Sequence, residues 1–327
     1  MYNLLTLISS VIAIVSPFIT GIIYFIRLLQ GKEDHITWLW ICVGLTAVVI
    51  ILALRCLKYR TLSRKRMKSI SGGMHTLTHK CRDTFFEIQH EFQKKTLGID
   101  FLTEKVEICL QSGLDALCTV LEDFTGQTVS ACIKLIEYSD SDVFQGIDED
   151  NARIRVFCRS TNSDPERKNY DHNPERKEMY LKDDTALLYI VGKRYNHLNH
   201  FYQGDLDRFI KSCEESQVDY KCPTQHREHF YNGTMILPIR VLSEKLYYFK
   251  NRDTYHVIGF LCVDSLSKSA FRPDQESYNC AVGNAFADEF YVILNRYRRY
   301  LVAMQQEKQI AEREAQKTVC LATGVGN

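Results

Sequence analysis

The side chains best suited to metal chemistry gather between residues 197 and 229. His197 and His200 form one His-x-x-His pair, His226 and His229 form another, and two cysteines lie between the pairs. Imidazole nitrogens and thiolates are the ligands that zinc prefers in proteins. However, these spacings match no zinc module, and loop histidines among tyrosines are usually polar surface. We therefore expect no bound metal, and these four histidines are the candidates if one is present.

Asp264 and Ser265 place a carboxylate and a hydroxyl at the end of an apolar, strand-like run. Polar groups in that position can face a ligand pocket. The same pair can instead be a simple cap, because Asp and Ser side chains hydrogen-bond to the backbone where an element ends. Both interpretations stay open at this point.

The chain carries no motif for nucleophilic or phosphate chemistry. It has no G-x-S-x-G sequence, and no serine or cysteine stands in a motif with its base. A glycine-rich phosphate loop is also missing from the sequence. We therefore expect no enzymatic activity, and the sequence names no cofactor.

An alternation of helices and strands must position these polar groups. Apolar residues in steps of three and four predict helices over about 70–93, 101–124 and 273–304. Short β-branched runs predict strands over about 128–137, 151–159, 231–241 and 255–264. Pro238 suits an edge strand or a bulge, whereas the run 255–264 is apolar on both faces and suits the centre of the sheet. Residues 161–230 are irregular and polar, with helical fragments over about 184–195 and 205–213.

This order of elements resembles the GAF domain, a sensor fold related to PAS domains. The residues Ile236 to Ile239 (ILPI) are similar to the family's fourth strand. The run from Ile258 to Ser265 (IGFLCVDS), followed by Phe271 and a helix, is similar to the family's usual ending. The resemblance covers about residues 100–300, and it implies an α+β fold with an antiparallel sheet and flanking helices.

The resemblance also suggests where a ligand binds. The start Thr185-Ala186-Leu187 is similar to the crossover helix that covers the family's ligand pocket. We therefore take Thr185, Asp264 and Ser265 as ligand-binding candidates. The chain lacks the signature of the cyclic-nucleotide-binding members and the phytochrome chromophore motif, so the resemblance names no ligand.

Two apolar stretches precede this domain. No charged side chain occurs from Met1 to Ile26 or from Ile36 to Leu54, and a polar turn lies between the two stretches. A helix needs roughly 20 apolar residues to cross a bilayer, so the sequence predicts two transmembrane helices, at about 4–27 and 36–55. The alternative, a cleaved signal peptide, lacks a basic n-region and is followed by a second apolar stretch.

A basic segment follows the second stretch. Its lysines and arginines include Lys58, Arg60, Arg64, Lys65, Arg66 and Lys68, with no acid among them. Positive charge beside a span marks the cytoplasmic side, so we expect a multi-pass protein of the inner (plasma) membrane with both termini in the cytoplasm. The same residues can contact anionic lipid headgroups.

The overall composition adds two limits. The formal net charge is +1 and 25% of the residues are charged, which gives no indication of a nucleic-acid partner. The 12 cysteines show no C-x-x-C pair and stand among apolar residues. Five of them, Cys109, Cys118, Cys132, Cys158 and Cys262, are expected to be buried thiols in a reducing compartment.

The predicted organisation is a hairpin (1–57), a basic linker (58–69), a connecting helix (70–98), a GAF-like domain (99–304) with an irregular insert (161–230), and a polar, disordered tail (305–327). Three functions fit it. The first is a membrane-tethered sensor or signalling adaptor that binds a small ligand or a protein partner. The second is a membrane-perturbing effector of the bacterial immunity type, and the third is a structural anchor with a ligand-free fold. The expected partners are the lipid bilayer, a second copy of the chain and a separately encoded output protein.

Overall fold

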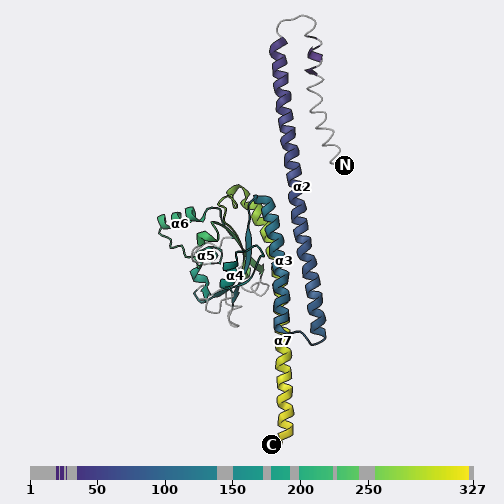
Figure 1. Cartoon of the computed structure of the whole chain (residues 1–327), viewed down its shortest axis with the longest axis vertical. Helices are drawn as coiled ribbons and strands as arrows, with labels where there is room; N and C mark the ends of the chain where they lie inside the picture. Colours follow the sequence, from purple (N-terminus) through teal and green to yellow (C-terminus); the bar gives the residue numbers. More distant parts are fainter. Residues whose placement is uncertain are drawn as a thin grey trace. The chain divides into compact units, whose positions relative to one another are not determined.

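The computed structural model describes residues 20–21, 23–25, 27, 35–137, 150–171, 178–191, 199–223, 227–242 and 255–323 (Figure 1). The chain divides into two compact units, Met1–Lys68 and Ser69–Asn327. The boundary between the units falls within helix α2 (His35–Gln93).

The first unit differs from its prediction in two respects. The expected linker, 58–69, is helical and belongs to α2, because this segment has no glycine or proline and is rich in helix-forming Lys and Arg. Within the part of the chain that the structure describes, no helix is long and apolar enough to cross a membrane. The predicted transmembrane hairpin therefore has no support from the structure. Its first span, about 4–27, lies almost entirely outside the described residues.

The second unit is an α+β domain built on one antiparallel sheet. Helix α3 (Ile99–Thr125) precedes a six-stranded sheet of order β3-β2-β1-β6-β5-β4. The strands are β1 (Ser130–Glu137), β2 (Arg153–Arg159), β3 (Met179–Tyr180), β4 (Phe201–Gln203), β5 (Gly233–Leu242) and β6 (Tyr255–Ser265). The crossover segment, defined here as residues 161–230, carries the helices α4 (Pro165–Asp171), α5 (Thr185–Val191) and α6 (Leu206–Glu215) and the 3-10 turns η2 (Leu181–Asp183) and η3 (Arg227–His229). A further turn, η5 (Pro273–Gln275), leads into the closing helix α7 (Glu276–Thr323). This architecture confirms the predicted α+β fold, an antiparallel sheet with flanking helices.

The sheet confirms both strand assignments. Strand β6 lies at the centre, between β1 and β5. Strand β4 pairs with β5 only as far as Ile236, and the β5–β6 register is irregular between Ile239 and Arg240. Pro238 therefore lies where, among the described residues, no second strand pairs with β5, and it lies close to a bulge. A missing backbone N–H is tolerated at both kinds of position.

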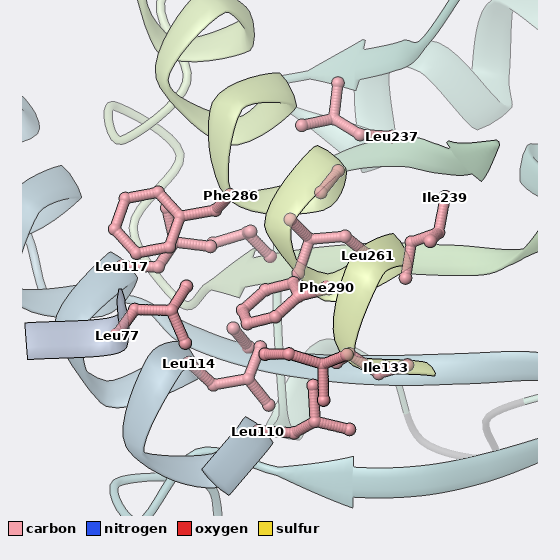
Figure 2. Close-up of a cluster of buried hydrophobic side chains, with 14 of the residues drawn as sticks. Leu77, Leu110, Leu114, Leu117, Ile133, Leu237, Ile239, Leu261, Phe286 and Phe290 are labelled. Carbon is pink, nitrogen blue, oxygen red and sulfur yellow. The ribbon is translucent and has the colours of Figure 1, made fainter. Parts of the chain in front are cut away.

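The face of the sheet toward α3 and α7 carries the larger hydrophobic core. Figure 2 shows side chains of the strands, such as Ile133, Leu237 and Leu261, meeting Phe286 and Phe290 of α7 and leucines of α3. Leu77 of α2 joins this cluster and is fully buried. These contacts explain the helical apolar stripes, since each stripe is the side of a helix that packs in this core.

The opposite face is covered by the crossover segment. Its core contains Cys132, Phe260 and Cys262 from the strands and Leu187 and Ile190 from α5. Side chains therefore fill the space between the sheet and α5. Four of the five cysteines expected to be buried thiols are buried, while Cys158 is half-buried, and all five are free thiols.

Two further segments differ from their predictions. Helix α7 continues to Thr323, whereas the sequence predicted a helix end near 304 and a disordered tail. The tail has no proline, and its first glycine is Gly324. Helix α2 begins at His35 and passes through Gly72-Gly73, whereas the sequence predicted a helix only from about residue 70. Gly73 is needed for packing, because a Cβ there would lie 2.9 Å from Val120 Cγ2 of α3.

Candidate functional site: a buried ionic cluster beneath the crossover

Side-chain alternation along the strands places polar groups on the face that the crossover segment covers. Cys132 and Ile136 of β1 lie in the core on that face, so Lys134 between them points the same way. On β6, Phe260 and Cys262 lie in the same core, and Asp264 continues their alternation. The sequence thus brings a lysine and an aspartate beneath the crossover.

Asp264 pairs with an arginine of the crossover. Arg167 of α4 donates from Nη1 to Asp264 Oδ2 over 3.0 Å, and the two side chains are only 8% and 7% exposed. Thr234 of β5 donates from its hydroxyl to Asp264 Oδ1 over 2.6 Å. The Arg167 guanidinium also lies over the ring of Tyr231, 5.1 Å from its centroid. Both oxygens of this buried carboxylate are therefore hydrogen-bonded.

Lys134 makes the second contact of this kind. Its Nζ lies 3.0 Å from Asp184 Oδ2, directly before α5. Burial works against the charge on Lys134, but Asp184 and the thiols of Cys262 and Cys132 outweigh this effect and raise the pKa of the lysine. Lys134 is therefore a stable cation inside the domain.

A third pair joins Arg159 at the end of β2 to Asp171 at the end of α4, with both side chains less than a tenth exposed. Each of the three pairs thus links a residue of the sheet to a residue of the crossover segment. We call the six residues the ionic cluster: Lys134, Arg159, Arg167, Asp171, Asp184 and Asp264.

Energetics make this arrangement noteworthy. The free energy needed to desolvate two charges is nearly as large as the free energy gained from their attraction. A buried ion pair therefore often stabilises a fold no better than apolar residues of the same volume. The surrounding core between sheet and crossover is apolar, and apolar replacements would be compatible with it. Buried charge in such a place is typical of positional specificity or of a functional site.

Tyrosines and thiols border the ionic cluster. The hydroxyl of Tyr231 lies 3.4 Å from Cys222 Sγ. Burial, together with Cys222 and Asp264, raises the pKa of Tyr231 well above its usual value, so the phenol is neutral. Cys132 and Cys262 stand directly opposite each other on β1 and β6. The hydrogen bond with Cys132 and burial hold the pKa of Cys262 well above its usual range.

The three predicted ligand-binding residues lie in different surroundings. Asp264 belongs to the ionic cluster. Ser265 points to the other side of the sheet and donates to Thr128 O over 2.7 Å, as expected for the next residue of a strand. Thr185 is buried beside Asp184, where its Oγ1 accepts from the backbone N–H of Lys221 over 2.8 Å. Thr185 and Ser265 therefore hold backbone segments in place.

The predicted metal candidates are only partly covered by the structure. His197 and His226 lie outside the described residues. His200 Nε2 is 2.8 Å from Glu276 Oε1, and His229 is largely exposed, 3.9 Å from Glu228. Within the described ranges, no three His, Cys, Asp or Glu residues are grouped so that they could hold a metal ion.

The basic residues predicted to contact lipid lie on α2 in the first unit. Lys58, Arg60, Arg64, Lys65 and Lys68 are exposed, and Arg66 is half-buried.

Sequence reasoning missed five of the six members of the ionic cluster. Arg167 and Asp171 fall in the irregular, polar segment 161–230, whose composition gives no indication of burial, although Arg167 is only 8% exposed. For Lys134 a signal existed: a lysine at an inward position of the apolar run Cys132–Ile136 needs a buried partner. The identity of that partner depends on the path of the crossover.

Comparisons with known proteins add little to this geometry. No protein-family model matches the chain, and no curated protein matches it. One similar solved structure is a type II free methionine-R-sulfoxide reductase from Thermoplasma acidophilum, with 14% identity, a TM-score of 0.33, and coverage of 59% of this chain and 96% of that chain. A second is the GAF domain of a phosphoenolpyruvate-protein phosphotransferase from Coxiella burnetii, with 12% identity, a TM-score of 0.33, and coverage of 62% and 94%. A third is a free methionine-R-sulfoxide reductase from Neisseria meningitidis in complex with its substrate, with 10% identity, a TM-score of 0.31, and coverage of 62% and 91%.

At TM-scores of this size, these likenesses carry no argument about the present chain. The α+β architecture of its domain is defined by its own order of helices and strands.

Proposed function

We propose that this chain is a membrane-attached, GAF-like sensor or signalling adaptor, which binds a small ligand or a protein partner and catalyses no reaction itself. The observation that carries the proposal is the ionic cluster. Its three pairs connect the crossover segment to the sheet in an otherwise apolar interior. A charged ligand that exchanges partners with these groups would release or reposition the crossover.

The filled interior defines how such a ligand would act. Apolar side chains and ion pairs occupy the space beneath α5, so binding requires the crossover segment to move. A ligand that carries both charges matches the cluster best, because it can replace a carboxylate and a guanidinium together and leave no buried charge unpaired.

Membrane attachment is the second element of the proposal, and the first unit supports it. The part of α2 before Lys58 exposes large apolar side chains, namely Trp40, Val43, Val48, Ile50, Ile51, Leu52, Leu54 and Leu57. A contiguous apolar surface of this kind needs a cover, and the basic segment that follows suits anionic lipid headgroups. We propose an inner-membrane location with the GAF-like domain in the cytoplasm.

Native mass spectrometry of the full chain, released from nanodiscs after purification from its host, tests the sensor proposal. We expect a retained small molecule or a co-purifying protein partner. The double variant Arg167→Met/Asp264→Leu replaces a buried pair with apolar groups and should lose the bound species while staying folded. The variant Arg272→Gln/Asp274→Asn removes an exposed ion pair and should retain it.

Two results would contradict the proposal. Absence of any bound species, from chains purified under several growth conditions, would favour the ligand-free structural anchor. Leakage of the host membrane on expression, abolished by deletion of the first unit, would favour the membrane-perturbing effector.

A further inference from the structure

A groove in the second unit lies on the far side of the domain core from the ionic cluster. It runs between α2, from Thr78 to Phe92, and α7, from Glu289 to Ala303, and its volume is about 780 Å³. Specific small-molecule sites have volumes of roughly 300–1,000 Å³ and are mainly apolar, with a few polar groups that orient the ligand. The groove meets the size criterion, and its lining decides which ligand it suits.

The floor of the groove is aromatic. Phe85 stacks on Tyr300 with a centroid distance of 6.3 Å, and Phe92 meets the edge of the same ring at 5.4 Å. Phe86 on the rim is 73% exposed. An apolar chain lying on this floor would remove large carbon surfaces from water, at about 25 cal/mol for each Å² that becomes buried.

The walls of the groove are predominantly cationic. Arg82, Arg296 and Arg299 line it, against one carboxylate in the lining, that of Glu289. Arg82 already contacts Asp83 at 3.0 Å. Arg296 lies over the ring of Phe85, 5.3 Å from the centroid, a stacking that leaves its N–H edge available. Among the described residues, no carboxylate lies within 4.0 Å of a nitrogen of Arg296 or Arg299.

One thiol of the groove has a lowered pKa. Cys81 lines the groove. The hydrogen bond from Cys109 and the positive charge of Arg296 outweigh burial and lower the pKa of Cys81 to about 7. Arg296, which lines the groove, thus contributes to the lowered pKa of Cys81 alongside the hydrogen bond with Cys109.

We propose that this groove binds an amphipathic carboxylate, a single apolar chain with one acidic head group. The head group would lie between Arg296 and Arg299, whose planar guanidinium groups match a carboxylate in two-point contacts. The apolar chain would lie along Phe85, Phe92 and Tyr300. This site is separate from the ionic cluster, and the inference does not rest on the function proposed for the cluster.

Photolabelling of the full chain in nanodiscs tests the proposal. The probe is a palmitic acid with a diazirine in its chain, and the adducts are located by peptide mass spectrometry. We expect adducts on residues 78–92 and 289–303. The variant Arg296→Gln/Arg299→Gln should lower this labelling at least about tenfold, because a hydrogen bond to a charged group contributes enough free energy for such a change. Arg298→Gln removes the same charge from an exposed position of the same helix that does not line the groove and should leave labelling unchanged.

A diazirine alcohol of equal chain length separates the head group from the chain. Weak labelling of the groove by the alcohol would support recognition of the carboxylate. The proposal would be overturned by equal labelling with acid and alcohol, by equal labelling of the double variant and the Arg298→Gln control, or by an absence of adducts from both groove helices. Circular dichroism of each variant shows whether α2 and α7 remain helical.

Discussion

At the scale of single residues, partner geometry decides the role of each polar group. Asp264 and Ser265 are neighbours in the chain, yet they lie on opposite faces of the sheet. Asp264 meets Arg167 and Thr234 beneath the crossover, whereas Ser265 binds the backbone of Thr128. The two neighbouring polar residues therefore have different roles: Asp264 belongs to the ionic cluster, and Ser265 holds a backbone segment in place.

The variant Asp264→Asn tests how much the ionic cluster contributes to the free energy of unfolding. It leaves the Arg167 guanidinium buried without its counter-charge, and breaking a buried pair in this way costs about 3–5 kcal/mol. We expect urea unfolding of the full chain to shift to markedly lower denaturant. The control Asp274→Asn breaks an exposed pair with Arg272 and should leave the midpoint unchanged. Equal midpoints for both variants would show that the buried pair contributes nothing.

A pH titration tests the electrostatics of the groove. Since the thiolate is the reactive form, alkylation of Cys81 by iodoacetamide should rise with pH through about 7. The pKa of Cys81 is lower in the folded state than the ordinary value of a free thiol. Deprotonation therefore stabilises the fold above the unfolded-state pKa, and this contribution is lost as the pH falls through about 7.

Arg296→Gln removes one of the charges that lower the pKa of Cys81 and should move the alkylation profile to higher pH. The buried Cys118, whose pKa burial raises to about 12, should stay unmodified across the same range. An unchanged profile in Arg296→Gln would contradict the assignment of this arginine to the groove. Peptide mass spectrometry provides the measurement at both thiols.

At the scale of elements, the positions of glycines show where helices approach closely. A Cβ at Gly113 of α3 would lie 2.6 Å from Phe290 Cε1 and 2.7 Å from Leu77 Cδ1. Both neighbours are fully buried in the core of Figure 2, so neither can move away freely. Gly113 thus sets the distance at which α2, α3 and α7 pack.

The variant Gly113→Ala should therefore destabilise the domain by about 1–3 kcal/mol, the usual cost of overpacking a filled core. Gly72→Ala is the matched control, since nothing lies within 4 Å of a Cβ at that helical position. Alanine is the better helix former by about 1 kcal/mol, and the control should be neutral or stabilising. Denaturant unfolding followed by circular dichroism measures both, and stabilisation by Gly113→Ala would contradict the observed packing.

At the scale of the whole molecule, the two units differ in how far they bury their apolar side chains. The second unit buries its apolar residues in two cores, one on each face of the sheet. In the first unit, α2 exposes a run of large apolar side chains and then a basic segment. An apolar surface beside positive charge is the combination that favours attachment to an anionic membrane.

We expect the full chain to remain in the membrane pellet after extraction with alkaline carbonate. Deletion of residues 1–68 should release the remaining chain into the supernatant. Replacing Lys58, Arg60, Arg64, Lys65, Arg66 and Lys68 with glutamine should preserve membrane retention but disturb orientation, because positive charge marks the cytoplasmic side. Release of the full chain by carbonate would contradict a membrane-integrated first unit.

Local patterns in the sequence determined most elements of the second unit. Burial imposes a periodicity on the sequence that predicts which faces are buried. Two examples are the apolar stripe at Leu110, Leu114 and Leu117 and the unbroken apolar run of β6. Pro238 likewise marks an edge, because a proline cannot donate to a second neighbouring strand. The extent of helices was less well predicted: α7 continues to Thr323 where its apolar stripe has already ended.

Only the tertiary structure decided which charged groups meet. Lys134 lies 50 positions before Asp184 in the chain, and Arg167 lies 97 positions before Asp264. No local pattern encodes such a contact, since it depends on the path of the crossover across the sheet. For the same reason, the polar sequence around Arg167 gives no indication that its side chain is buried. The groove also forms from two distant helices, α2 and α7, so that neither its arginines nor its aromatic floor form a motif in the sequence.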